Sequence, residues 1–248
     1  MKGRILFIHG YTQNSQTFYA KTSALRKKLI KSGYEPVYLN GPLLLTPADF
    51  PGEDFGKFQS GDDDFRAWWI KPGQTNAGID ITEAIDTVKK YVDEENAEGK
   101  ETTKQDIVGV IGFSQGAALG GLIHNKFEEL FGHTLKFSIL YSGFKLDTSK
   151  NSGNEDLKQY YPSKPNGKIL HVIGELDTVI DESRALSLVD VLGGDILKHP
   201  GGHFVPNSKV YVEKVVAWIA STEVEPKAEE KEDKEEEDIL AMMDKLGV

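Results

Sequence analysis

Short apolar runs alternate with amphipathic segments along most of the chain. The runs are rich in β-branched and aromatic residues, and most are apolar on both faces, which is typical of buried parallel strands. They lie at residues 4–9, 35–39, 67–70, 106–111, 135–141, 168–173 and 195–198. Helical spacing of apolar residues fills the gaps between them, at residues 18–29, 81–92, 181–192, 210–219 and after Ser114. The pattern predicts an α/β domain with a mostly parallel central sheet flanked by helices.

The pattern changes near Thr222. From Glu223 to Asp238 the chain carries ten acidic and three basic residues, a net charge of −7, which is typical of a disordered acidic segment. The apolar residues of 239–246 then return at helical spacing. We therefore expect one folded domain at residues 1–221 and an acidic tail at 222–248. We expect the terminal helix to dock on a protein partner or on a second copy of the chain; a tail that only aids solubility is the alternative.

Composition narrows the class of protein. The 248 residues include 39 Asp or Glu and 29 Lys or Arg, a net charge of −10, whereas nucleic-acid-binding proteins normally carry a basic surface. The absence of cysteine excludes disulfides, thiolate zinc sites and cysteine nucleophiles. No apolar run approaches the roughly 18 residues of a membrane span, and the first residues do not resemble a signal peptide. We expect a soluble cytoplasmic protein, with the nucleus left open, that binds no nucleic acid and does not span a membrane.

A serine between two glycines interrupts the apolar run VIGFSQGAAL. The order is an apolar strand, then Gly112-Phe113-Ser114-Gln115-Gly116, then a helix. In a sharp strand-to-helix turn the two glycine positions leave no room for side chains, and the serine hydroxyl is exposed above the sheet at a helix N-terminus. The alternatives are a helix-capping serine and a dinucleotide-binding loop, but Ser114 occupies the third glycine position of the latter. The pattern therefore indicates a nucleophile, provided that a base and an acid follow.

An aspartate and a histidine follow in the order that such a hydrolase requires. Asp177 comes directly after the apolar strand KILHVIG, and His203 lies in the glycine-rich loop after the next strand. Asp177 would orient the imidazole of His203, which would take the proton of Ser114 and return it to the leaving group. Single residues of this kind are more often turn or loop residues, but three matches at the expected strand ends favour a catalytic triad.

Other assignments of these residue types are weaker. His199 and His203 have the spacing of zinc ligands on a helix, but Pro200-Gly201-Gly202 between them will not form one. Asp181 lies where a helix begins and is expected to cap it. Three more histidines, His124, His133 and His171, are expected to be structural. We therefore expect no metal site.

Acyl transfer also requires hydrogen-bond donors for the oxyanion, preferably rigid backbone amides. One candidate is the amide of Gln115, directly after the nucleophile. The other is the amide of Tyr11, because Gly10 allows a tight turn after the first strand. A simple strand-ending turn is the alternative for His9-Gly10.

Five blocks of the sequence together resemble a known family. They are LFIHGYTQNSQTF, IGFSQGAALGG, YSGFKL, GELDTVIDESRAL and HPGGHFVPNSK, and in this order they are similar to the fungal family of serine hydrolases, within the α/β-hydrolase superfamily. The resemblance runs from Arg4 to Ile219. It implies the α/β-hydrolase fold, with Ser114, Asp177 and His203 as triad and Tyr11 and Gln115 as oxyanion donors. It also implies a small esterase without a metal or an organic cofactor.

The sequence says less about the substrate. The irregular stretch between Gly41 and Phe65 is either a lid or a surface loop. If RAWWIK is a strand, at most one of Trp68 and Trp69 faces the pocket. The segment between the expected strands at 135–141 and 168–173 comprises only residues 142–167, which are too few for a large cap domain. We expect a carboxylesterase for short to medium acyl chains. The alternatives are a thioesterase, a lysophospholipase, or a hydrolase-fold binding protein that acts through its acidic tail.

Overall fold

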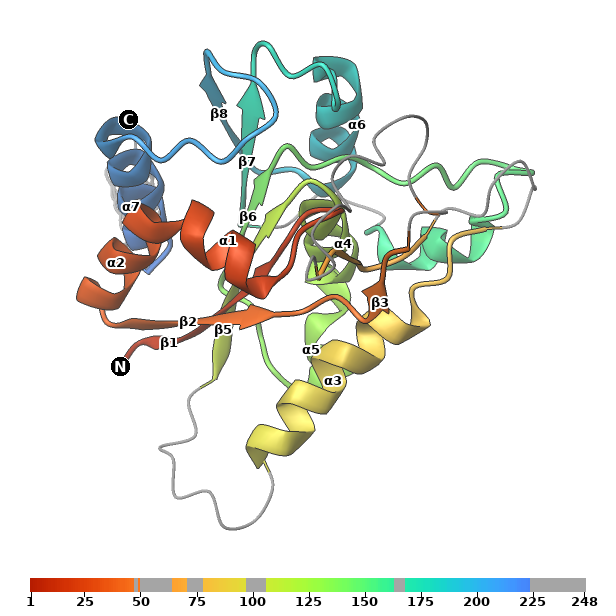
Figure 1. The fold of residues 1–248 in the computed structure, drawn as a ribbon, viewed down its shortest axis with the longest axis horizontal. Helices are drawn as coiled ribbons and strands as arrows, with labels where there is room; N and C mark the ends of the chain where they lie inside the picture. Colours follow the sequence, from red (N-terminus) through yellow and green to blue (C-terminus); the bar gives the residue numbers. More distant parts are fainter. Residues whose placement is uncertain (47–48, 50–63, 71–77, 97–105, 163–167, 224–248) are drawn as a thin grey trace, which may run out of the picture.

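Six parallel strands form the central sheet (Figure 1). The computed structural model describes residues 1–46, 49, 64–70, 78–96, 106–162 and 168–223. Along the sheet the strands are β2 (Tyr34–Leu39), β1 (Gly3–Ile8), β5 (Ile107–Phe113), β6 (Phe137–Tyr141), β7 (Ile169–Gly174) and β8 (Asp195–His199). Every neighbouring pair is parallel. The predicted parallel sheet is therefore confirmed, and the apolar strand β5 lies near its centre.

Helices cover both faces of the sheet, as Figure 1 shows. The helices are α1 (Ser15–Lys21), α2 (Ser23–Lys31), α3 (Thr82–Asn96), α4 (Gln115–Ile123), α5 (Phe127–Phe131), α6 (Glu182–Leu192) and α7 (Lys209–Glu223). Apolar residues of α1, α2 and α7 pack on one face, and those of α3, α4, α5 and α6 pack on the other. Because successive strand residues point to opposite faces, each central strand contributes to both layers.

The segment expected as one helix at residues 18–29 is divided at Thr22. Its backbone there has φ −106° and ψ 20°, outside helical values, and its hydroxyl donates to the carbonyl of Phe18 at 2.7 Å. Phe18, Leu25 and Leu29 nevertheless all face the core. The apolar spacing thus predicted the buried face correctly, but not the break.

The strand expected at residues 67–70 is a correction to the sequence analysis. Only β4 (Arg66–Ala67) forms, and it pairs antiparallel with β3 (Leu43–Leu44) in a separate two-stranded sheet. Trp68 and Trp69 follow it and are both buried. Their main-chain groups bond to a side chain of α4 and not to a neighbouring strand, which explains why the strand ends at Ala67.

Helix α7 ends two residues beyond the expected domain boundary, at Glu223. The carboxylate of Glu223 accepts hydrogen bonds from Lys2, at 2.6 Å, and from the hydroxyl of Tyr34. Glu223 therefore joins the end of the chain's last described helix to its first strands. The rest of the predicted tail, with its terminal helix, and most of the predicted loop at 41–65 lie outside the described residues.

A large cap domain was not expected between β6 and β7. Between β6 and β7 the described residues form one 3₁₀ helix, Glu155–Tyr160, so no large cap domain is present in the described part of the chain. Among those residues no helix is long and apolar enough to cross a membrane.

Candidate active site

Ser114 lies on the turn between β5 and α4 and has an unusual backbone conformation. Its φ of 52° and ψ of −114° fall where residues with a side chain are rare, and such strain costs about 1–3 kcal/mol and is concentrated at functional sites. The turn is held at both ends, because the Ser114 amide donates to the Tyr141 carbonyl at 2.9 Å and the Ser114 carbonyl accepts from the Ala118 amide at 2.9 Å. The turn thus fixes the hydroxyl at the carboxyl edge of the sheet.

Gly112 and Gly116 are required because no side chain fits at either position. A Cβ atom on Gly116 would lie 2.1 Å from the carbonyl oxygen of Ile8 and 2.5 Å from that of His9. One on Gly112 would lie 2.4 Å from the carbonyl oxygen of Gly116. The opposing atoms belong to the backbone and cannot rotate away, so the structure confirms the interpretation of the two glycines.

Ser114, His203 and Asp177 form one chain of hydrogen bonds. The Oγ of Ser114 lies 3.0 Å from Nε2 of His203, and Nδ1 of His203 lies 2.8 Å from Oδ2 of Asp177. Ser114 follows β5, Asp177 follows β7 and His203 follows β8. The carboxyl ends of parallel strands share one edge of a sheet, which is why residues 89 and 26 positions apart meet.

The carboxylate of Asp177 is built to stay charged. Its side chain is 1% exposed, and its second oxygen accepts the amides of Val179 at 3.0 Å and Ile180 at 2.8 Å. Burial alone would raise the pKa of Asp177, but the hydrogen bonds from Ile180 and His203 outweigh burial and lower that pKa. An ionised Asp177 favours the proton on Nδ1 of His203 and leaves Nε2 as a hydrogen-bond acceptor facing the hydroxyl of Ser114.

The alternative residues lie elsewhere. Asp181 caps α6 by accepting the Arg184 amide at 3.0 Å, as expected. His199 is 2% exposed, and its Nδ1 accepts the amide of Gly201 at 3.2 Å. Its ring packs against those of Phe204 and Tyr211. His199 therefore supports the loop that carries His203.

The other histidines have structural partners. Nδ1 of His124 bonds to the Ser138 hydroxyl at 2.7 Å, and Nε2 of His171 bonds to the Gly193 carbonyl at 2.9 Å. His133 lies beside Asp106 at 3.5 Å. In the described part of the chain no three His, Asp or Glu side chains are grouped to hold a metal ion.

The structure places both residues expected to donate to the oxyanion near Ser114. Gln115 is the first residue of α4, and Tyr11 lines the same cavity as Ser114 and His203. The phenol of Tyr11 donates to the Asp49 carbonyl at 2.8 Å. Gly10 packs so closely on Phe113 that a Cβ there would lie 2.9 Å from the ring. The loop after β1 is thus held against the turn that carries Ser114.

The sequence analysis missed a buried network beneath this loop. The side-chain oxygen of Gln115 accepts the Trp68 amide at 2.9 Å, and its NH₂ group donates to the Trp69 carbonyl at 2.8 Å. The indole of Trp68 donates to the His9 carbonyl at 2.9 Å. His9 bonds through Nδ1 to Gly10 and accepts the Gly41 amide on Nε2, both at 2.8 Å. The sequence offers no local signal for this network, because its bonds to Trp68 and Trp69 join residues 46 to 59 positions apart along the chain.

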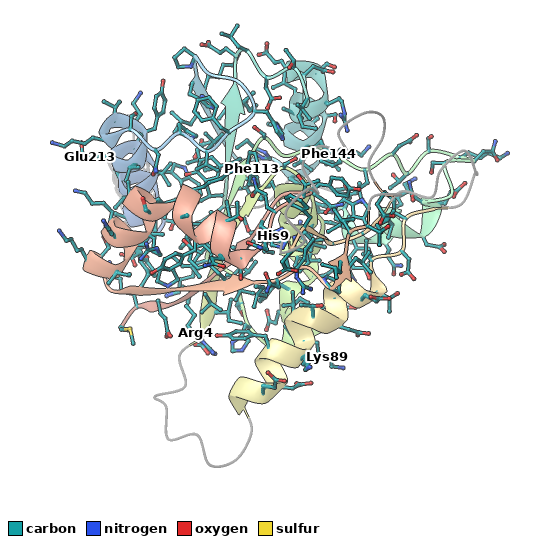
Figure 2. All side chains as sticks on the ribbon, in the orientation of Figure 1. Arg4, His9, Lys89, Phe113, Phe144 and Glu213 are labelled. Carbon is teal, nitrogen blue, oxygen red and sulfur yellow. The ribbon has the colours of Figure 1, made fainter. Side chains whose placement is uncertain are left out.

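These residues lie in the interior of the molecule. In Figure 2, His9 and Phe113 are close to the middle of the fold, whereas Lys89 and Glu213 lie toward its periphery. Burial lowers the pKa of His9 to about 4, so the ring is neutral at physiological pH and one nitrogen donates while the other accepts. The network therefore holds the loop after β1 by neutral hydrogen bonds.

A cavity of about 400 Å³ opens at Ser114. Ligand-binding cavities commonly measure about 300–1,000 Å³ and are lined mainly by apolar groups. Phe18, Phe113 and Val205 supply apolar walls, and the half-exposed Phe204 lies at the same cavity. The cavity can hold a compact apolar group beside Ser114.

The sheet, its two helix layers and the serine turn define an α/β hydrolase. The profile of the family described as Serine hydrolase (FSH1) matches residues 1–215, and the chain belongs to this family of serine hydrolases. It is 33% identical to Family of serine hydrolases 3 of Saccharomyces cerevisiae over 99% of this chain and 98% of that protein. It is 36% identical to Esterase OVCA2 of Danio rerio over 82% and 90% of the two chains.

A solved structure supports the fold assignment. SOBER1 of Arabidopsis thaliana aligns with a TM-score of 0.60 at 18% identity, covering 90% of this chain and 100% of that one. At this identity the likeness concerns the fold alone. Together with the family, it establishes that the chain is an α/β-hydrolase-fold enzyme that hydrolyses esters.

Proposed function

We propose that the protein cleaves carboxylic esters through an acyl-enzyme on Ser114, with His203 as general base and acid and Asp177 as the orienting carboxylate. The observation that carries this proposal is the continuous hydrogen-bond chain from Oγ of Ser114 to Asp177. Because the carboxylate is buried and held by two amides, it keeps the imidazole in the tautomer that accepts the serine proton.

In the first half-reaction Oγ of Ser114 bonds to the acyl carbon as its proton passes to Nε2 of His203. The carbonyl oxygen becomes an oxyanion, which the backbone amides of Tyr11 and Gln115 stabilise. The carbon–oxygen bond of the ester then breaks, and His203 gives its proton to the departing alcohol. Asp177 stabilises the imidazolium between these two steps.

Water completes the reaction. His203 takes one proton from the water molecule, whose oxygen attacks the acyl carbon, and returns that proton to Oγ of Ser114 as the acid leaves. The cavity of about 400 Å³ and its aromatic walls favour short to medium acyl chains. Thioesters and lysophospholipids would follow the same steps and are tested as competing substrates.

Labelling with a fluorophosphonate probe, followed by mass spectrometry, tests the nucleophile. The wild-type protein should gain one adduct on Ser114 and hydrolyse 4-nitrophenyl butyrate, whereas Ser114→Ala should do neither. Ser187→Ala is the matched control, because that hydroxyl bonds only to the Arg184 carbonyl on an exposed helix face. Retained turnover in folded Ser114→Ala would refute the mechanism. A wild type that neither labels nor turns over any ester would favour a binding protein.

A further inference from the structure

One permanent positive charge lies at the active-site cavity. Lys21 is the last residue of α1 and is exposed, and it lines the cavity that also contains Ser114 and His203. The described residues that line this cavity include no Asp or Glu. The phenol of Tyr11 stays neutral, because burial and the nearby Asp49 raise its pKa. An anionic group in the cavity would therefore meet the charge of Lys21 and no carboxylate among the described lining residues, while the charge of Asp177 lies behind His203 on a side chain that is 1% exposed.

No carboxylate of the described residues forms an ion pair with Lys21. Other exposed lysines do have such partners: Lys2 pairs with Glu223 at 2.6 Å, and Lys198 pairs with Glu182 at 2.5 Å. The ammonium of Lys21 is thus available to a ligand. Its position in the last turn of α1 also complements the helix dipole, and this structural role is the alternative that an experiment must separate.

The N-terminal part of the chain, which carries Lys21, is basic. Residues 1–34 contain seven Lys or Arg and no Asp or Glu, although the whole chain has a net charge of −10. On the neighbouring helix α2, Lys27, Lys28 and Lys31 line a second cavity of about 330 Å³ together with Lys209. Glu213 pairs with Lys28 at 3.8 Å and with Lys209 at 3.9 Å, but the lysines outnumber it, and a local excess of one sign raises the concentration of oppositely charged ligands beside it.

We propose that this enzyme prefers esters that carry a free carboxylate remote from the ester bond, and that Lys21 binds this carboxylate. The inference rests on the proposed esterase function. The apolar walls formed by Phe18, Phe113 and Val205 hold the hydrocarbon part, and the ammonium at the cavity accepts the charged end. Half-esters of dicarboxylic acids and esters of hydroxy acids have this chemistry.

The test compares esters that differ only in the remote charge. One arm uses the 4-nitrophenyl half-ester of octanedioic acid and the same compound with its free carboxylate methylated, followed by release of 4-nitrophenolate. The other arm uses the butyryl ester of 6-hydroxyhexanoate and its methyl ester, followed by release of butyrate. The measured quantity in each arm is the ratio of kcat/KM for the charged ester to kcat/KM for the methylated ester.

Lys21→Met should lower this ratio about fivefold in one of the two arms, which corresponds to about 1 kcal/mol. The arm that responds identifies whether the acyl side or the alcohol side of the ester faces Lys21. Lys21→Glu should lower the ratio further. The wild-type ratio should also fall as ionic strength rises from about 0.02 M to about 0.5 M, because salt screens exposed charges. Lys89→Met is the control for net charge, because this exposed lysine lies on α3, on the opposite face of the sheet (Figure 2). The ratio measured for Lys89→Met should equal that of the wild type.

The two levels of the proposal fail differently. If the wild type labels with the fluorophosphonate probe and hydrolyses the methylated esters, but the Lys21 variants leave both ratios unchanged, the carboxylate preference is refuted and Lys21 serves only its helix. If the wild type neither labels nor hydrolyses any of the four esters, the proposed function itself fails.

Discussion

Replacing Gln115 with alanine should both destabilise the protein and lower its rate of ester hydrolysis, although Gln115 is expected to contribute only its backbone amide to the reaction. The side chain is buried and bonds at 2.9 Å to the Trp68 amide and at 2.8 Å to the Trp69 carbonyl. Alanine leaves both main-chain groups without these partners, 47 and 46 residues away along the chain.

The size of the effect follows from the two lost partners. A buried polar group without a hydrogen bond costs about 1–3 kcal/mol, so the pair accounts for about 2–6 kcal/mol. Water that enters the vacated space would offset part of this cost, which places the expected loss near 3 kcal/mol. In a domain of this size about 1 kcal/mol lowers Tm by about 2–4 °C, so Tm should fall by roughly 6–12 °C.

Thermal and urea unfolding, followed by far-UV circular dichroism, measure the loss, and hydrolysis of 4-nitrophenyl butyrate measures the rate. Because the peptide amide of Gln115 shifts with its side chain, kcat should fall about tenfold, less than the 10²–10³ expected for a donor removed outright. Gln159→Ala is the matched control, since the side chain of Gln159 is exposed and donates only to the Asp156 carbonyl. A Gln115→Ala protein with Tm within about 2 °C of the wild type would show that the network does not hold the turn.

Four further outcomes are expected. His203→Ala should lower kcat/KM for 4-nitrophenyl butyrate by several orders of magnitude, because triad residues act as a unit, and His199→Ala should lower it far less; equal losses would contradict the assignment. Burial lowers the pKa of His9 from 6.5 to about 4, so between these pH values the unfolded state binds a proton that the folded state does not. The free energy of unfolding should therefore fall by about 3 kcal/mol as pH drops from about 6.5 to about 4. If His9→Gln leaves this pH dependence of urea unfolding unchanged, His9 is not its cause. Truncation after Glu223 should leave ester hydrolysis within about twofold, or about 0.4 kcal/mol of barrier, since Ser114, Asp177 and His203 all precede it; a larger loss of rate would place the tail in the site. Addition of EDTA should not change the rate, and a chelator-sensitive rate would revive the zinc interpretation.

Much of the fold and of the site could be predicted from the sequence, because the relevant signals are local. An apolar run that ends in Gly-x-Ser-x-Gly indicates both a strand and the turn that follows it, and the same holds for the runs before Asp177 and His203. Once the strands are parallel, their carboxyl ends must share an edge. The meeting of Ser114 with His203 at 3.0 Å therefore follows from the order of the elements.

Only the tertiary structure decided the contacts between distant segments. Nothing near Trp68 in the sequence indicates that its amide bonds to the side chain of Gln115, or that β4 ends at Ala67 because of that bond. The same holds for Lys21. The helical pattern indicates only that it is one of several exposed lysines, whereas the packing of α1 places it at the cavity that contains Ser114. Periodicity indicates which face of an element is buried. The partner of a buried polar group depends instead on which distant segments the fold brings within hydrogen-bond distance. The residues next to that group in the sequence do not indicate those segments.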